Sequence, residues 1–107
     1  MKGWGGYMKM VTAVIRTSSL ERIVEMLEAR GFKGMTIFAV KGTGEEVRLN
    51  NPYTIHERIE IVVPDDQADS VVDIILEHGR SGLVGDGIVA VAPLEYAVKI
   101  RTKERLT

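Results

Sequence analysis

The spacing of apolar residues near the start of the chain predicts a strand, a helix and a second strand. Residues 10–16, MVTAVIR, alternate loosely and are rich in β-branched side chains, which favours a strand. Ser18 and Glu21 match a capping box at the start of a helix. The apolar face of this helix has helical spacing: Leu20, Ile23, Val24 and Leu27. Gly31 ends the helix, and residues 35–41, MTIFAVK, form the next strand.

The same order returns in the second half of the chain. Residues 58–63, RIEIVV, predict a strand that ends at Pro64, because proline cannot donate a hydrogen bond to a ladder. A helix capped by Asp65 or Asp66 follows, and four residues form its apolar face: Ala68, Val71, Val72 and Ile75. Gly79 ends this second helix.

Two further strands are expected after a glycine-rich loop, at residues 88–92 and around residues 97–101. The repeated order β-α-β predicts the α+β class and a ferredoxin-like βαββαβ sandwich, an antiparallel sheet with two helices on one face. Both faces of the first strand carry small or apolar side chains: Thr12 and Val14 on one, Ala13 and Ile15 on the other. We therefore expect the face opposite the helices to pack on neighbouring subunits.

Length and composition fit one domain. The chain has 107 residues, 45% of them hydrophobic, and we expect a domain over residues 8–107 with an N-terminal extension at residues 1–7. The net charge of −1 gives no general attraction to nucleic acid or anionic membranes. Cysteine is absent, and no apolar run approaches the about 20 residues of a membrane span, so we expect a cytoplasmic protein that is not inserted in a membrane.

Candidate catalytic and metal-binding groups are few. His56 and His78 are far apart in the sequence, and neither has a second ligand at a spacing typical of metal sites. The serines, histidines and acidic residues suggest no nucleophile with its base. We therefore predict a binding protein with no enzymatic activity, metal ion or catalytic cofactor. A weak metal site formed by Glu45, Glu46 and His56 is a minor alternative.

Glycines gather at two junctions between predicted elements, residues 40–46 (VKGTGEE) and residues 79–88 (GRSGLVGDGI). Unhindered backbone N–H groups at such junctions form concavities that bind anions. Alternating cations follow in residues 98–105, and in a strand three of them would share one face: Lys99, Arg101 and Lys103. Alone they would fit a solvated edge strand, but beside two glycine loops they favour a ligand that carries phosphate.

Five motifs in the chain resemble the P-II signal-transduction proteins and occur in the family's order between about residues 8 and 104. They are GMT at 34–36, VKGTG at 40–44, IEIVVPDDQ at 59–67, SGLVGDG at 81–87 and IRT at 100–102. The resemblance implies a homotrimer of ferredoxin-like subunits that binds adenine nucleotide (ATP, ADP or AMP) in clefts between subunits. It also implies regulation of a partner protein, such as a membrane transporter, an enzyme or a regulator, through the loop between the second and third strands.

The same resemblance implies which residues would surround the nucleotide. Three would lie around the adenine: Thr36, Glu60 and Val62. Two would line the cleft at the root of the partner loop: Gly42 and Gly44. Three would wrap the phosphates and the ribose: Gly85, Asp86 and Gly87. Two would reach the phosphates from the adjacent subunit: Lys99 and Arg101. The partner surface would lie in the loop of about residues 43–54 and include four residues: Glu45, Glu46, Arg48 and Tyr53.

Several positions depart from the family pattern. Thr43 stands where an aromatic residue is usual, and Glu46 where a glutamine helps to hold magnesium and 2-oxoglutarate. His56 replaces a lysine that pairs with 2-oxoglutarate, and Ile88 replaces a lysine that contacts phosphate. The partner loop is also shorter than usual. We expect 2-oxoglutarate to bind poorly or not at all, because Glu46 repels an anion and a neutral His56 does not attract one. We also expect ADP or AMP to compete well with ATP.

Three alternatives stay open. A structural or interaction trimer of the same fold would have lost its nucleotide, which Ile88 favours and the retained glycines oppose. An RNA-binding module shares the element order but stacks bases on aromatic residues of its sheet, and the predicted strands here carry only Phe38. A metal-responsive trimer is disfavoured by the absence of cysteine and the scarcity of histidine.

Overall fold

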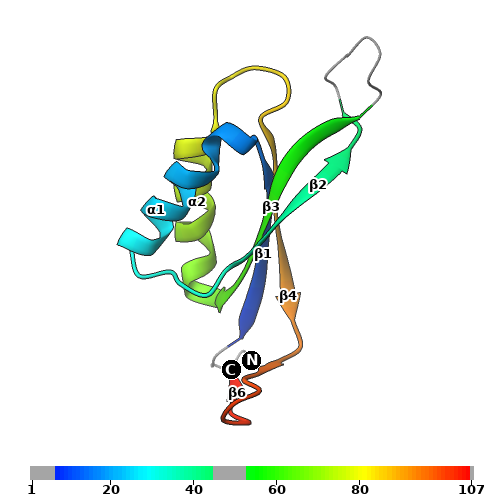
Figure 1. Cartoon of the computed structure of the whole chain (residues 1–107). Coiled ribbons are helices and arrows are strands. Elements are labelled where there is room, and N and C mark those ends of the chain that lie inside the picture. Colours follow the sequence, from blue (N-terminus) through cyan, green and yellow to red (C-terminus); the bar gives the residue numbers. More distant parts are fainter. Residues whose placement is uncertain (1–6, 45–52, 107) are drawn as a thin grey trace.

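The computed structural model describes residues 7–44 and 53–106 and has the predicted order of main elements (Figure 1). The main elements are β1 (Met8–Ile15), α1 (Leu20–Ala29), β2 (Thr36–Gly42), β3 (Thr54–Pro64), α2 (Ala68–Gly79) and β4 (Gly87–Leu94). Single 3₁₀ turns precede the two helices: η1 (Thr17–Ser19) and η2 (Asp65–Gln67). Two short strands follow β4: β5 (Ala97–Val98) and β6 (Arg105–Leu106). β1 and β3 both begin earlier than the sequence pattern predicts.

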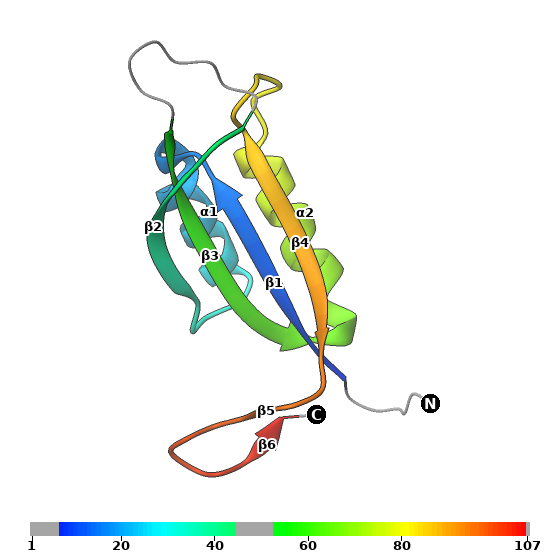
Figure 2. The same ribbon diagram turned by 90° about the vertical axis from the view of Figure 1, so that its right-hand side faces the viewer.

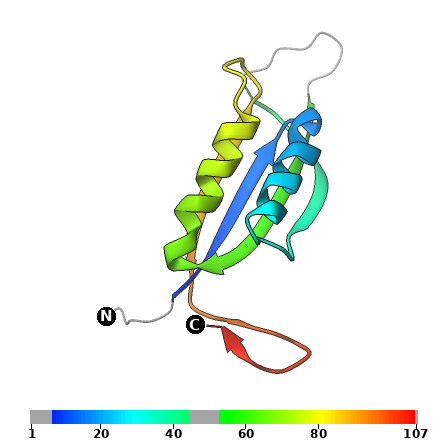
Figure 3. The same cartoon turned by 90° about the vertical axis from the view of Figure 1, so that its left-hand side faces the viewer.

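The four long strands form one antiparallel sheet in the order β2-β3-β1-β4. In its register, Val11 of β1 lies opposite Ile61 of β3 and Val91 of β4. Both helices pack on one face of the sheet, and in the described part of the chain no helix covers the other face (Figures 1 and 3). This arrangement confirms the predicted ferredoxin-like α+β sandwich. Neither of these helices has the length and apolarity needed to cross a membrane.

The hydrophobic core lies between the sheet and the helices. Alternate residues of β1 and β3 are buried there: Val11, Ala13, Ile15, Ile59, Ile61 and Val63. The helices add six more: Ile23, Leu27, Ala68, Val71, Ile74 and Ile75. The predicted face of α2 contained Val72 in place of Ile74, but Val72 is only half-buried. These two residues flank the buried face on opposite sides, so helical spacing alone does not decide between them.

Neither predicted helix cap is present. Ser18 lies inside η1, and the N-cap residue of α1 is Ser19, whose side chain makes no capping hydrogen bond. Asp65 and Asp66 lie inside η2, and the N-cap residue of α2 is Gln67, again without a side-chain cap. In both places the chain enters the helix through a 3₁₀ turn, whose backbone hydrogen bonds take the place of a side-chain cap.

The C-terminal segment forms a separate hairpin, so the strand predicted around residues 97–101 is wrong beyond β5. Backbone hydrogen bonds from Lys99 N to Glu104 O (2.9 Å) and from Lys103 N to Lys99 O (2.8 Å) close a turn. Lys103 has a left-handed backbone, with φ of 60°, and the chain reverses there. Lys99, Arg101 and Lys103 therefore do not share a strand face. The hairpin lies beyond the end of the sheet at which β1 begins (Figure 2).

Candidate functional site

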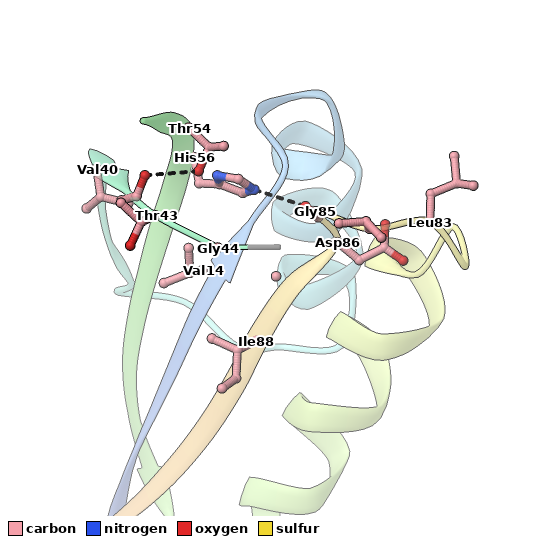
Figure 4. Close-up of a pocket in the computed structure, with 13 residues that line it drawn as sticks. Val14, Val40, Thr43, Gly44, Thr54, His56, Leu83, Gly85, Asp86 and Ile88 are labelled. Carbon is pink, nitrogen blue, oxygen red and sulfur yellow. Dashed lines mark hydrogen bonds between the residues drawn. The ribbon is translucent and has the colours of Figure 1, made fainter. Parts of the chain in front are cut away.

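A pocket of about 390 Å³ lies where β2 ends, β3 begins and the loop before β4 reaches the sheet (Figure 4). Its volume lies within the roughly 300–1,000 Å³ typical of small-molecule sites. Four glycines from the two predicted junctions line it: Gly42, Gly44, Gly85 and Gly87. Apolar side chains line it from β1, β2 and β4: Val14, Val40 and Ile88. Polar side chains come from Thr43, Thr54, His56 and Asp86.

The loop before β4 is organised around the Asp86 carboxylate. Its Oδ2 accepts hydrogen bonds from the backbone N–H groups of Ser81 and Gly82, both at 2.8 Å. Its Oδ1 accepts hydrogen bonds from the Ser81 hydroxyl at 2.5 Å and from Arg16 Nε at 3.0 Å. The hydrogen bonds from Ser81, followed by that from Arg16, hold the pKa of Asp86 well below its usual range. The carboxylate thus holds the loop together from within.

Arg16, which the sequence analysis did not single out, connects β1 to this loop. It directly follows β1, and its Nη2 donates a hydrogen bond to the carbonyl oxygen of Val84 at 2.6 Å. Its Nε binds Asp86, which lies 70 positions later in the chain. No sequence motif marks Arg16. Only its position in the sequence could have pointed to this role, because a cation directly after a buried strand lies near the loop that meets the end of that strand.

His56 contacts the same loop from within the pocket. Its Nε2 lies 2.9 Å from the carbonyl oxygen of Gly85 (Figure 4). A carbonyl oxygen only accepts hydrogen bonds, so this contact requires a hydrogen on Nε2. On the same strand, the buried Thr54 donates its hydroxyl to the carbonyl oxygen of Gly42 at 3.3 Å. The two side chains of β3 therefore tie together both glycine junctions that border the pocket.

The glycines of the pocket have two different roles. Gly87 has φ of 104°, and a Cβ atom there would lie 1.8 Å from the carbonyl oxygen of Val14. Gly85 also has a positive φ, of 98°, which favours glycine. A Cβ atom at Gly42 or Gly44 would meet nothing within 4 Å. Packing therefore requires glycine at position 87, whereas Gly42 and Gly44 keep space open at the pocket.

The pocket brings together half of the residues expected around a nucleotide: Gly42, Gly44, Gly85, Asp86 and Gly87. The other expected residues do not line it. Thr36 and Glu60 lie opposite each other on β2 and β3, towards the far end of these strands, and Val62 lies further along β3. Lys99 and Arg101 lie in the C-terminal hairpin, beyond the opposite end of the sheet (Figure 2).

The predicted partner loop is described only at its two ends. Glu45, Glu46 and Arg48 lie outside the described residues, as do two of the three residues of the alternative metal site. Tyr53 is described, and Lys41 Nζ lies 5.3 Å from the centroid of its ring. In the parts of the chain that the structure describes, no three histidine, cysteine or acidic side chains are grouped so that they could hold a metal ion.

Comparisons with known proteins place the chain in a family. The family model for nitrogen regulatory protein P-II matches residues 8–104. The nitrogen regulatory protein GlnK of Escherichia coli is 35% identical, with 91% of this chain and 95% of that protein covered. Nitrogen regulatory protein P-II 2 of Methanothermobacter thermautotrophicus is also 35% identical, with 92% and 93% covered. The crystal structure of Arabidopsis thaliana PII bound to citrate has a TM-score of 0.81 and 32% identity, with 92% of this chain and 88% of that chain covered. The chain therefore belongs to the nitrogen regulatory protein P-II family.

Proposed function

We propose that this protein is a cytoplasmic signal-transduction regulator that binds an adenine nucleotide (ADP, AMP or ATP) and controls a partner protein through its β2–β3 loop. A membrane transporter, an enzyme or a regulator would suit as the partner. Membership of the P-II family supports the regulatory role. The proposal includes no catalysis, because the only carboxylate among the described residues that line the pocket, Asp86, is already engaged within its own loop.

The observation that carries the nucleotide proposal is the meeting of two glycine junctions at one pocket. Gly42 and Gly44 follow each other closely at the end of β2, and Gly85 lies just before Gly87, the first residue of β4. Backbone N–H groups without side chains beside them can approach phosphate oxygens closely. Apolar side chains in the same wall suit the sugar or the base. The pocket therefore offers both kinds of surface that a nucleotide needs.

Only half of the residues expected around a nucleotide line the pocket of one chain, which favours a homotrimer. The sheet face without helices carries many small or apolar residues: Met10, Thr12, Val14, Phe38, Ile88, Ala90 and Ala92. Phe38 and Ile88 are 40% and 67% exposed. The charges of Arg58 and Glu60 on this face compensate each other at 3.1 Å. Packing these faces together would bury apolar area worth roughly 25 cal/mol per Å². It would also allow residues at the far end of one sheet and in its hairpin to reach a neighbour's pocket.

The described part of the pocket favours a nucleotide with a short phosphate chain. Ile88 presents an alkyl group where an ammonium group would attract phosphate, and His56 is engaged with Gly85. A close charge pair in a partly wet site is worth about 1–4 kcal/mol. Without such a charge pair, the affinity for a highly charged ligand would be lower by a factor of roughly ten to a thousand. We therefore propose that ADP and AMP bind at least as well as ATP, and that 2-oxoglutarate binds poorly.

Isothermal titration calorimetry of the full chain tests these proposals with AMP, ADP and ATP, each with and without magnesium and 2-oxoglutarate. Gly44→Val should weaken nucleotide binding, because its side chain would enter space that is now open. Ala39→Val is the matched control, since it adds bulk to β2 at a position that does not line the pocket. If no nucleotide gives a heat of binding, the nucleotide proposal fails and the alternative of a structural or interaction trimer remains. Tight, magnesium-dependent binding of ATP together with 2-oxoglutarate would refute the proposed ligand preference.

A further inference from the structure

At the end of the sheet that borders the pocket, the backbone hydrogen bonds between strands stop. Beyond that point, side chains connect the elements. The last ladder positions of β1 join Ile15 to Glu57 of β3 and to Gly87 of β4. Directly beyond them, Arg16 and His56 both reach the loop before β4. The loop is therefore held by two side chains at the point where strand pairing stops.

These two side chains hold successive peptide groups of the loop from different sides. Arg16 Nη2 donates to the Val84 carbonyl oxygen at 2.6 Å, and Arg16 is not part of the pocket wall. His56 Nε2 lies 2.9 Å from the Gly85 carbonyl oxygen, and His56 lines the pocket (Figure 4). The Val84 carbonyl is thus held by a side chain outside the pocket wall, and the Gly85 carbonyl by a side chain that lines the pocket.

The direction of the Val84 carbonyl determines the direction of the next N–H group. In a planar trans peptide the C=O and the N–H point in opposite directions, and the described residues contain no cis peptide. Because Arg16, which does not line the pocket, holds the Val84 oxygen, the N–H of Gly85 points away from Arg16. Among the described residues, this N–H has no hydrogen-bond acceptor, whereas the N–H groups of Ser81 and Gly82 are both used by Asp86.

We propose that Arg16 is a positioning residue of the pocket, which keeps the Gly85 N–H turned towards a phosphate oxygen of the bound nucleotide. It does so by holding the Val84 carbonyl and the Asp86 carboxylate with one guanidinium group. This inference rests on the proposed nucleotide-binding function. A donor that is already in place needs no reordering when the anion arrives, which raises affinity. Because Ile88 supplies no charge, backbone donors such as this one carry a larger share of phosphate binding.

The role requires an arginine and not simply a cation. Nε and Nη2 of Arg16 bind two different acceptors at once, Asp86 Oδ1 at 3.0 Å and Val84 O at 2.6 Å. A guanidinium group keeps these donors in a fixed fork, whereas lysine carries one ammonium group on a flexible stem. The Arg16 side chain is only 28% exposed, so water competes weakly for these two contacts. Lysine at position 16 should therefore restore part of the function at most.

Calorimetric titration with ADP tests the inference on four proteins: wild type, Arg16→Ala, Arg16→Lys and Arg30→Ala. Arg30 is an exposed arginine at the end of α1 and serves as the control, because it does not line the pocket. We expect Arg16→Ala to lower ADP affinity about tenfold or more, Arg16→Lys to fall between it and wild type, and Arg30→Ala to match wild type. In ¹H–¹⁵N spectra, ADP should shift the Gly85 amide resonance of wild type and shift it less in Arg16→Ala.

An Arg16→Ala protein that keeps its fold and oligomeric state and binds ADP as tightly as wild type overturns the inference. If Arg16→Ala does not fold, Arg16→Lys decides, and wild-type affinity together with a wild-type Gly85 response overturns the inference. A wild-type protein that binds no adenine nucleotide overturns the proposed function, and this inference with it. If wild type binds ADP and Arg16→Ala binds it equally well, only the positioning role fails and the proposed nucleotide binding stands.

Discussion

A Cβ atom on Gly87 would lie 1.8 Å from the carbonyl oxygen of Val14, because β4 begins directly against the end of β1. Gly87 also has φ of 104°, which strains any other residue. We expect Gly87→Ala to lower the free energy of unfolding by about 2 kcal/mol or more, through the clash and the strained backbone together. Urea denaturation followed by circular dichroism measures this change.

Gly44→Ala is the control for that experiment. A Cβ atom at Gly44 would meet nothing within 4 Å, and no positive φ is recorded there. The free energy of unfolding should change by no more than about 0.5 kcal/mol. Equal stability losses in the two alanine variants would show that packing against Val14 does not explain why position 87 is glycine.

The Asp86 carboxylate should make part of the stability depend on pH. Its pKa in the folded protein lies below the usual value of 3.8, mainly because of hydrogen bonds from Ser81 and then Arg16. The folded state therefore favours ionised Asp86, and this contribution is complete well above pH 3.8 and is lost as the pH falls towards the folded-state pKa. Wild type should exceed Asp86→Asn in free energy of unfolding most clearly at neutral pH.

Denaturation curves of both proteins between about pH 7 and pH 2.5 measure this difference, since they bracket the usual carboxylate pKa. The gap between wild type and Asp86→Asn should narrow as the solution becomes more acidic. Asp73→Asn is a suitable control, because Asp73 is exposed on α2 and does not line the pocket. A gap that stays constant down to the lowest pH would contradict the assigned role of the charge.

Most of the fold could be predicted from the sequence, because burial in this fold follows local periods. β1 buries every second residue from Val11 to Ile15, β3 does so from Ile59 to Val63, and α1 buries Ile23 and Leu27 on one helical face. The errors occur where local pattern and tertiary contact disagree. Alternating cations suggest a strand after β5, but Lys103 adopts a left-handed backbone and the chain turns. Serine and aspartate suggest caps, but 3₁₀ turns begin both helices.

The candidate site was predictable to the extent that glycine marks it. Gly42 and Gly44 lie in a short motif at a strand end, and Gly85 and Gly87 lie in another, and the fold brings the two motifs to one pocket. Arg16 was not predictable in this way, because its partner Asp86 is 70 positions away and neither residue signals the other. Contacts in the proposed trimer depend on assembly, which the local pattern indicates only through the apolar residues on the sheet face without helices.

The sheet face without helices provides a test of the proposed trimer. Ala90 lies on this face, opposite Thr12 of β1, and is exposed in the single chain. Ala90→Glu should give a folded monomer, because an unpaired carboxylate buried between subunits costs several kcal/mol, on the order of 3–5. Light scattering coupled to size exclusion measures the mass. Leu76→Glu on α2, where Leu76 is 51% exposed, should leave a trimer intact. A trimer in both variants would show that another surface forms the assembly.

Ile88 should limit the binding of nucleotides with long phosphate chains. Ile88 is 67% exposed and lines the pocket beside Gly87, where in the proposed binding mode an ammonium group would lie near phosphate. Ile88→Lys should therefore raise affinity for ATP about tenfold and raise affinity for AMP less, because more phosphate charge lies within reach. Ile88→Met is the matched control, since it has a long unbranched side chain without charge. Calorimetry with ATP and AMP on both variants measures the ratio of the two affinities. If Ile88→Lys leaves that ratio at its wild-type value, the phosphate chain does not extend along the start of β4, and the proposed contact of phosphate with the glycines there is wrong.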